Sequence, residues 1–252
     1  MSIKGAARRM IEEAFEVRIV RRKDVPIILE QEHLRKFFEA FDVDCVFDVG
    51  ANVGQYAHML RREIGFTGAI VSFEPMPEHA AALRSAAEGQ GEWYVEEMAL
   101  DMTEGTATFN VFAADQFSSL HSVSTEGSGL FEAHTKLSRQ IRVKTSTAAT
   151  QFQKYRDKLG FRRPFLKMDT QGHDLNVAKG AGKFLREFVG LQSELAIQRL
   201  YDDSPSFGEA LAFYTANGFE LSAFVPNNYG YFPRLLEIDC IMYRKSSNAR
   251  ET

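Results

Sequence analysis

Glycine and acidic residues occur in two segments of the chain with the spacing of a nucleoside-binding site. A short apolar run reaches Asp48 and is followed by Gly50, Asn52 and Gly54. Glycine lets the backbone turn sharply and approach a ligand closely. Glu74 stands twenty positions after Gly54, where a carboxylate can bridge the two hydroxyls of a ribose. The pattern predicts a ribose-containing ligand; a tight turn without any ligand is the simpler alternative.

The glycine-containing turn differs from the dinucleotide fingerprint G-x-G-x-x-G, because Asn52 stands at the position of its second glycine. The larger side chain crowds the path of a pyrophosphate, so a ligand with a ribose but no phosphate fits better. S-adenosylmethionine is such a ligand, and the Asn52 side chain is suited to bond its amino-acid end. A nicotinamide-dependent oxidoreductase is the alternative that this departure disfavours.

A second acidic segment has residues that could assist a methyl transfer. Asp169 ends an apolar run and precedes Thr170-Gln171-Gly172-His173-Asp174. A hydroxyl that attacks a methyl donor benefits from a nearby base. Asp169 is the first candidate for this base, and His173 is the second because imidazole titrates near neutral pH. Glu194, at the end of the next predicted strand, is suited to bond the acceptor; all three could instead only support the local backbone.

Metal chemistry at this edge of the predicted sheet is the less favoured possibility. Asp169, Glu194 and Asp174 could together hold Mg²⁺, which prefers oxygen ligands, but the chain lacks a clear paired-aspartate signature. Its two cysteines, Cys45 and Cys240, lie in separate apolar runs without zinc-ligand spacing. We therefore expect no metal centre and two buried free thiols.

An irregular segment at about 113–140 carries further polar side chains. Ser118, Ser119 and His121 are candidates for acceptor binding, and Gln171 is a fourth. A loop of this length inside a compact domain is usually functional or mobile. The alternative is a solvated lid whose side chains take no part in chemistry.

Strands and helices alternate along the chain in the way that a parallel sheet requires. Apolar runs predict strands at 45–49, 69–73, 93–95, 164–169, 189–197, 219–225 and 235–244, with half-exposed strands at 105–112 and 141–145. Helical patterns cover 52–64, 77–88, 174–188 and 207–217. This order predicts a Rossmann-like α/β domain.

The 252 residues suit one such domain with a small appendage. We expect an N-terminal helical extension over 1–42, a main domain over 43–245 with a lid-like insert at about 113–140, and a tail over 246–252. The extension could form a homodimer contact, close over the active site, or cover the domain's own sheet.

Charge and hydropathy restrict the partners and the location of the chain. A net charge of −4 argues against broad nucleic-acid binding, which needs a basic face. The chain lacks an apolar segment of membrane-spanning length, and its N-terminus is too charged for a signal peptide. A cytoplasmic protein that acts on a small molecule or a glycan is the expectation.

Four segments in order resemble the FkbM family of S-adenosylmethionine-dependent methyltransferases, within the class I methyltransferase fold. These segments are DVGANVGQY (48–56), SFEP (72–75), ALD (99–101) and LKMDTQGHDLNVAKGA (166–181). The resemblance covers residues 43–243 and implies a seven-stranded, mostly parallel sheet with helices on both faces and an antiparallel last strand. Two departures are Asp174 in place of the more usual glutamate and a turn at 146–150 without an acid.

The resemblance also implies roles for individual residues toward the cofactor. Glu74 would hold the ribose. The other implied cofactor-binding residues are Gly50, Asn52 and Gly54 along the methionine part, Pro75, Met76, Ala99, Leu100 and Asp101 around the adenine, and Asp48, Tyr56 and Asp169 beside them. We expect O-methylation of a hydroxyl on a small molecule, sugar or glycan. N-methylation of a small amine, and a non-catalytic nucleoside-binding module, are the alternatives.

Overall fold

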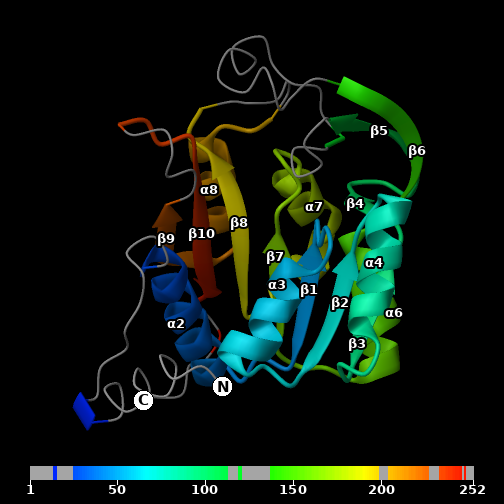
Figure 1. The fold of residues 1–252 in the computed structure, drawn as a ribbon. Helices are drawn as coiled ribbons and strands as arrows, with labels where there is room; N and C mark the ends of the chain where they lie inside the picture. Colours follow the sequence, from blue (N-terminus) through cyan, green and yellow to red (C-terminus); the bar gives the residue numbers. More distant parts are fainter. Residues whose placement is uncertain are drawn as a thin grey trace.

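A seven-stranded sheet forms the centre of the molecule in the computed structural model, which describes residues 14–15, 25–112, 119–120, 137–198, 204–226, 233–245 and 247 (Figure 1). Its strands are β1 (Cys45–Val49), β2 (Ala69–Phe73), β3 (Trp93–Glu96), β7 (Pro164–Met168), β8 (Gly190–Ala196), β9 (Phe219–Pro226) and β10 (Glu237–Arg244). They lie in the order β3-β2-β1-β7-β8-β10-β9. β10 pairs antiparallel with β8 and β9, and the other pairs of neighbouring strands in this sheet are parallel. The predicted mostly parallel sheet with an antiparallel last strand is confirmed.

Helices cover both faces of this sheet (Figure 1). One apolar layer contains side chains of α2 (Val25–Ala40), α3 (Gln55–Met59), the π-helix η2 (Leu60–Ile64) and α4 (Pro77–Ala87). The other contains side chains of α6 (Ala148–Leu159), α7 (Asp174–Gly180), the 3-10 helix η4 (Gly182–Glu187) and α8 (Phe207–Ala216). Successive residues of a strand point to opposite faces, so the buried strands supply both layers.

The helix α2 covers the domain's own sheet, which was one of three roles considered for the N-terminal extension. Leu34, Phe37 and Phe38 are buried. The ring of Phe37 lies edge-on to that of Phe165 at 5.4 Å, and Phe38 lies edge-on to Phe66 at 5.3 Å. Each such side chain contributes roughly 1.5–3 kcal/mol through burial, and these contacts hold α2 against this face of the sheet. Most of the extension before Val25 lies outside the described residues.

A second sheet joins β4 (Ala99–Asp101), β5 (Gly105–Phe112) and β6 (Leu137–Thr147) in the order β4-β6-β5. The strands β5 and β6 pair antiparallel, and β5 corresponds to the half-exposed strand predicted at 105–112. Because it pairs with β5, β6 begins at Leu137 and is longer than the strand predicted at 141–145. Its first residues belong to the end of the predicted insert. The residues 113–118 and 121–136 of that insert lie outside the described residues.

Two helices differ from the sequence-based expectation for local reasons. The helix predicted from residue 52 begins at Gln55, because Asn52 and Gly54 have φ angles of 50° and 93° that no α-helix accommodates. The helix α6 was not predicted. Its signal is Thr147, whose side chain accepts a hydrogen bond from the Thr150 N–H at 3.1 Å and caps the helix.

Gly50 is the point where the turns after β1 and β7 come together. Its φ is +78°, and a Cβ at this position would overlap the backbone carbonyl oxygen of Asp169. The Asp169 N–H donates to the Val49 carbonyl at 3.0 Å, and the Gly50 N–H donates to the Phe73 carbonyl at 3.1 Å. The missing side chain at Gly50 therefore allows the two segments singled out in the sequence to touch.

A Gly50→Ala substitution should destabilise the protein far more than Gly65→Ala. Gly65 has nearly the same φ, +76°, but no heavy atom lies within 4 Å of the place that a Cβ would occupy there. Gly65→Ala thus carries only the left-handed backbone penalty, about 1–2 kcal/mol, whereas Gly50→Ala should cost at least about 4 kcal/mol because backbone must move. Urea unfolding of both variants measures the difference, and equal losses would contradict the close approach.

Candidate active site

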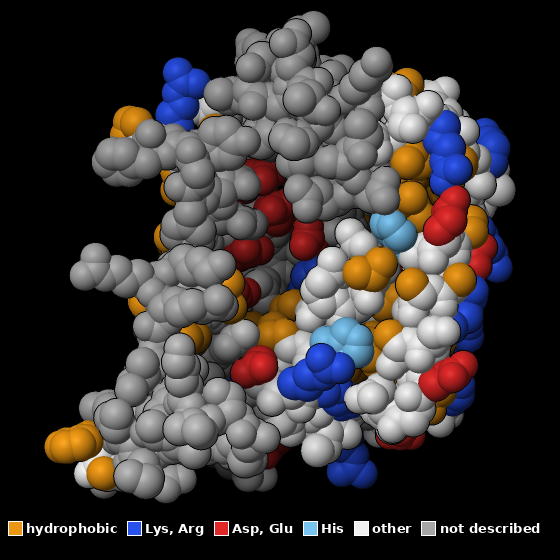
Figure 2. Space-filling model, viewed as in Figure 1, with side chains coloured by type: hydrophobic (Ala, Val, Ile, Leu, Met, Phe, Trp, Pro, Cys, Tyr) orange, Lys and Arg blue, Asp and Glu red, His pale blue; other side chains and the backbone are white. Residues whose placement is uncertain are grey.

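A cavity of about 510 Å³ opens at the carboxyl ends of β1, β2, β7 and β8, where open α/β sheets bind their ligands. Figure 2 shows acidic side chains gathered in a hollow on this face of the molecule. The second sheet contributes Ala99, Leu100 and Phe109 to the lining, and α2 contributes Glu30. The cavity thus joins both segments singled out in the sequence.

Most of the predicted site residues line this cavity. They are Gly50, Asn52, Tyr56, Glu74, Pro75, Met76, Ala99, Leu100, Asp169, Gln171, His173 and Glu194. Four predicted residues are not among the described lining residues, namely Asp48, Gly54, Asp101 and Ser119. Ser118 and His121 lie outside the described residues.

Glu74 is held in place by the backbone of the two turns beside it. Its Oε2 accepts a hydrogen bond from the Asn52 N–H and its Oε1 accepts one from the Met76 N–H, each at 2.9 Å. The left-handed conformation of Asn52, which asparagine tolerates better than most residues, directs that N–H toward the carboxyl group. Burial raises the pKa of Glu74 to about 7, although the two N–H groups oppose the rise.

Asp174 fastens the turn after β7 to the neighbouring strand β8. Its Oδ1 accepts hydrogen bonds from the Thr170 N–H at 2.8 Å and the Thr170 hydroxyl at 2.5 Å. Its Oδ2 accepts from the Ser193 hydroxyl and the Glu194 N–H, each at 2.9 Å. With four donors on one buried carboxyl group, Asp174 determines how Asp169 and Glu194 lie relative to each other at the cavity wall.

Gln171 bridges the two carboxylates that this turn brings together. Its side-chain Nε2 donates to Asp169 Oδ1 at 3.2 Å and to Glu194 Oε2 at 2.9 Å. The residue adopts a φ of 54°, which is uncommon for a side chain of this kind. The Ser119 hydroxyl donates to the Gln171 carbonyl oxygen at 2.8 Å, so Ser119 supports the site through Gln171.

His173 lines the cavity with both of its ring nitrogens engaged by protein groups. Nε2 lies 2.9 Å from Asp101 Oδ1, and Nδ1 lies 3.2 Å from Asn176 Nδ2. The Asn176 amide can only donate there, so Nε2 carries the proton and donates to Asp101. Asp101 therefore contacts His173, and this arrangement favours a supporting role for the imidazole over a direct role as a base.

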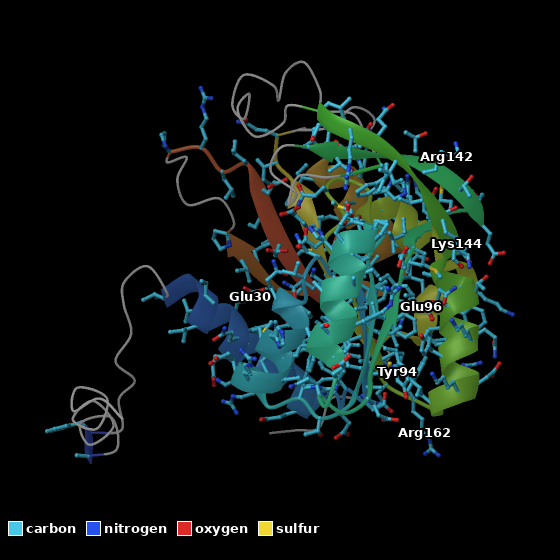
Figure 3. The ribbon with its side chains drawn as sticks, turned by 45° about the vertical axis from the view of Figure 1, so that its right-hand side comes forward. Glu30, Tyr94, Glu96, Arg142, Lys144 and Arg162 are labelled. Atoms are coloured by element: carbon cyan, nitrogen blue, oxygen red, sulfur yellow. The ribbon has the colours of Figure 1, made fainter. Side chains whose placement is uncertain are left out.

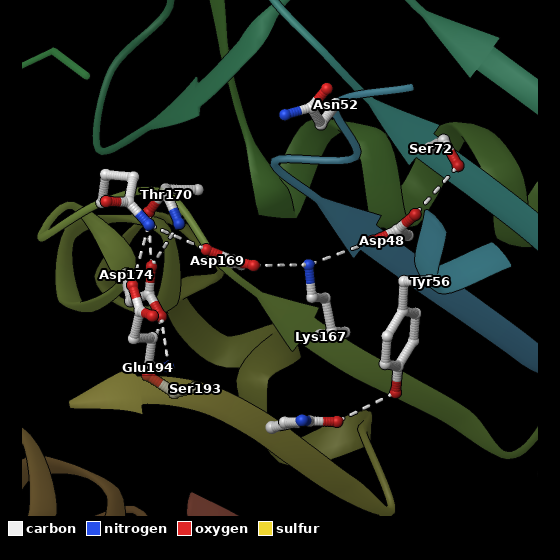
Figure 4. A network of polar contacts seen from close by, with 12 residues as sticks. Asp48, Asn52, Tyr56, Ser72, Lys167, Asp169, Thr170, Asp174, Ser193 and Glu194 are labelled. Atoms are coloured by element: carbon white, nitrogen blue, oxygen red, sulfur yellow. Dashed lines mark hydrogen bonds and ion pairs between the residues drawn. The ribbon is translucent and has the colours of Figure 1, made fainter. Parts of the chain in front are cut away.

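Lys167 is the main functional candidate that the sequence interpretation missed. It is 6% exposed and lines the cavity. Its Nζ lies 3.4 Å from Asp169 Oδ2 and 3.5 Å from Asp48 Oδ1, as Figure 4 shows. Burial alone would lower the pKa of Lys167, but the carboxylates of Asp169 and Asp48 outweigh it and raise the pKa. The sequence does distinguish Lys167, because it is the single charged residue inside the apolar strand Pro164–Met168.

Glu30 brings the helix α2 into the site and was also missed. Its Oε1 accepts a hydrogen bond from Gln192 Nε2 at 2.8 Å, and Gln192 Oε1 accepts one from the Tyr56 hydroxyl at 3.0 Å. Figure 3 places Glu30 on α2, at the other side of the view from Arg142 and Lys144. The sequence offered no local signal, because Glu30 is one of several acids on that helix.

The strand β10 adds two more carboxyl groups to the lining, Glu237 and Asp239. Asp239 stands opposite Glu194 in the strand pairing. Burial, then the neighbouring Glu237 and Asp169, raise the pKa of Glu194 well above its ordinary value. Burial and Asp169 likewise raise the pKa of Asp239. In the sequence, Glu237 and Asp239 could have been recognised as acids at alternate positions of a largely apolar strand.

Metal binding and membrane crossing find no support in the part of the chain that the structure describes. None of its groups of three or more His, Cys, Asp or Glu residues is arranged to hold a metal ion, so the Mg²⁺ alternative is not supported. Likewise, none of its described helices combines the length and apolar character that a membrane span needs. Cys45 and Cys240 are buried free thiols, as predicted.

Sequence comparison decides the family. The profile described as Methyltransferase FkbM domain matches residues 48–221. The chain belongs to this methyltransferase family. The match spans Asp48, Glu74, Asp169 and Glu194, and confirms the resemblance seen in the sequence. A search of curated proteins finds no match.

Solved structures with similar folds include several methyltransferases. The FkbM methyltransferase of Methylobacillus flagellatus KT is 13% identical, with a TM-score of 0.47 over 80% of this chain, which spans 44% of that protein's length. An O-methyltransferase from Bacillus cereus in complex with SAH is 10% identical over 95% of this chain and 90% of its own, with a TM-score of 0.47. The magnesium protoporphyrin IX methyltransferase of Synechocystis PCC 6803 with bound SAM is 11% identical over 97% and 98%, with a TM-score of 0.46.

The raised pKa of Glu74 predicts a pH-dependent contribution to stability in the ligand-free protein. The folded carboxyl titrates at about 7 and the unfolded one near 4.5, so folding retains a proton between these values. Stability should therefore fall as the pH rises from about 4.5 to about 7, by up to about 3 kcal/mol. Urea unfolding of wild type and Glu74→Gln at pH 4.5 and 8 isolates this change. A pH-independent difference between the two proteins would contradict the assignment.

Proposed function

We propose that this FkbM-family protein is an S-adenosylmethionine-dependent methyltransferase that acts on a hydroxyl of a small molecule, sugar or glycan. The observation that carries the proposal is one continuous cavity with two chemically different ends. Glu74 is oriented by backbone N–H groups at one end, and Asp169, Glu194 and Glu237 line the other. The first end suits a nucleoside and the second suits a hydroxylated acceptor.

The residues at the Glu74 end fit the cofactor. Each Glu74 oxygen accepts one backbone N–H and keeps a second lone pair with which to accept a ribose hydroxyl. Met76, Ala99 and Leu100 supply apolar surface beside it, suited to the adenine ring. Asn52 lines the same wall, and its side-chain amide is suited to the amino-acid end.

The residues at the acidic end fit transfer to oxygen. When bound, S-adenosylmethionine supplies a methyl group on a sulfonium sulfur, so that a carbon–oxygen bond forms as the carbon–sulfur bond breaks. Glu194 is our candidate for accepting the hydroxyl proton, because its raised pKa makes its carboxylate a stronger base than usual. Asp169 accepts hydrogen bonds from Lys167 and Gln171, which suits it to anchoring the acceptor rather than to removing its proton.

N-methylation of an amine is the second candidate, favoured by the acidic character of this end of the cavity. Five carboxyl groups line it, those of Glu30, Asp169, Glu194, Glu237 and Asp239, with one lysine, Lys167. A cationic amine would stabilise the ionised form of these carboxyl groups, among which Glu194 and Asp239 have raised pKa values in its absence. An amine that arrives neutral needs less help from a base, so loss of a carboxylate would reduce its methylation less.

Calorimetry tests the cofactor assignment. At pH 8, where Glu74 is mostly ionised, the wild type should bind S-adenosylmethionine, and Glu74→Ala should bind at least about tenfold more weakly because charge-assisted hydrogen bonds are lost. Glu78→Ala is the matched control, since Glu78 is exposed and pairs with Arg139. Binding of NAD in preference to S-adenosylmethionine, or an unchanged affinity of Glu74→Ala, would refute the assignment.

The acceptor class can be tested with a panel of sugars, glycolipids, hydroxylated polyketides and amines. With a hydroxyl acceptor, Glu194→Gln should lower kcat by about 10²–10⁴-fold, the usual contribution of a positioned base. The affinity for S-adenosylmethionine should stay unchanged. Glu97→Gln, at an exposed residue paired with Arg84, is the control. An undiminished kcat would exclude Glu194 as the base, and methylation of amines alone would favour the second candidate.

A further inference from the structure

A row of polar side chains crosses the main sheet beneath α3, on the face that is otherwise apolar. The strand pairing places Ser72 beside Asp48, Asp48 beside Lys167, and Lys167 beside Gln192. Paired residues of neighbouring strands project to the same face, so these four side chains form one continuous row. Ser72 donates to Asp48 Oδ2 at 3.2 Å and accepts from Trp93 Nε1 at 3.0 Å.

Lys167 is the centre of this row, and its two carboxylate partners have different surroundings. Asp48 is fully buried, whereas the side chain of Asp169 is 42% exposed and lines the cavity. The ring of Tyr56 lies 5.2 Å from the ammonium nitrogen. Lys167 therefore joins a carboxylate inside the protein to one at the cavity wall.

Stability alone does not account for this arrangement. A buried ion pair is usually no more stabilising than apolar residues of similar size, because removing both charges from water is costly. Val46 and Phe165, on the same face of the same two strands, are buried apolar residues. Asp48 and Lys167 lie near the ends of β1 and β7 that reach the cavity. A charged group that acts on a molecule in the cavity would have to lie there.

We propose that Lys167 is a positioning residue, which is held by Asp48 and fixes the Asp169 carboxylate at the cavity wall. Lys167 binds Asp169 Oδ2 while Gln171 binds Oδ1, so the carboxylate is held from both sides. Each oxygen then has a lone pair directed by this arrangement toward an acceptor hydroxyl. The inference rests on the proposed methyl transfer, in which Asp169 anchors the acceptor.

The double variant Asp48→Asn/Lys167→Met separates positioning from stability. Lys167→Met alone would leave the Asp48 carboxylate buried without its cation, which is strongly destabilising. The asparagine of the double variant is neutral, and its side-chain oxygen can still accept the Ser72 hydroxyl. We expect an unfolding midpoint near that of wild type and an affinity for S-adenosylmethionine within about threefold. The kcat should fall about tenfold to a hundredfold, the usual effect of a misplaced group near the chemistry.

The ion pair of Lys154 and the partly buried Glu96, neither of which lines the cavity, provides the matched control. Glu96 lies well away from Glu30 in Figure 3. The variant Glu96→Gln/Lys154→Met removes the same charges and should retain wild-type kcat. In the Asp48→Asn/Lys167→Met background, a further Asp169→Asn change should have little additional effect, because Lys167 acts through Asp169.

Several results would overturn the proposal. These are an unchanged kcat in the folded double variant, a loss of cofactor affinity equal to the loss of kcat, or additive effects of Asp169→Asn. If the double variant does not fold, Lys167→Arg keeps the charge but moves the donors, and an unchanged kcat there would also overturn the proposal.

If the wild type methylates no acceptor, the proposed function fails. A crystal structure of the double variant then decides whether Lys167 positions Asp169. An Asp169 carboxylate in the same place as in the wild type would refute this role.

Discussion

The contact between the turns after β1 and β7 is the constraint on which the rest of the cavity depends. Gly50 has no side chain, and the Asp169 carbonyl occupies the space that a side chain would need. The turn that carries Asn52 and the turn that carries Gln171 are thereby held against each other. Glu74 closes the first turn through the Asn52 N–H, and Asp174 closes the second through Thr170. A few backbone contacts thus set the distance between the two ends of the cavity.

Two networks of buried polar side chains support this framework. Asp174, Ser193 and Tyr214 form hydrogen bonds beneath the Asp169 turn, and the row through Lys167 lies on the opposite face of the sheet. Buried polar groups are costly unless they are bonded, so each network restricts the side chains that it contains. Asp174, which is not among the residues that line the cavity, thereby holds the turn that carries Asp169.

The family resemblance implied the arrangement of the sheet, whereas local patterns in the sequence were sufficient to predict its strands, the Gly50 turn and a carboxyl group, Glu74, beside that turn. These local patterns involve residues within about twenty positions of one another, so a single sequence is enough to recognise them. The start of α3 was misjudged because the left-handed conformation of Asn52, which directs its N–H to Glu74, has no signal in the helical pattern of the sequence. Lys167, Glu30 and Asp239 were missed because their importance arises from the order and register of strands distant in the chain. The chemical roles of Asp169, His173 and Glu194 stay predictions that only measurement can decide.

The position of Glu30 on α2 has a consequence for how such a site can change over time. The residues that match the family profile run from 48 to 221, so Glu30, Glu237 and Asp239 all stand outside them while lining the same cavity. The Glu74 end is built wholly from matched residues. Substitutions in the flanking segments can therefore alter the charge at the acidic end of the cavity and leave the Glu74 end unchanged, and exchange of those flanks between relatives would change that charge.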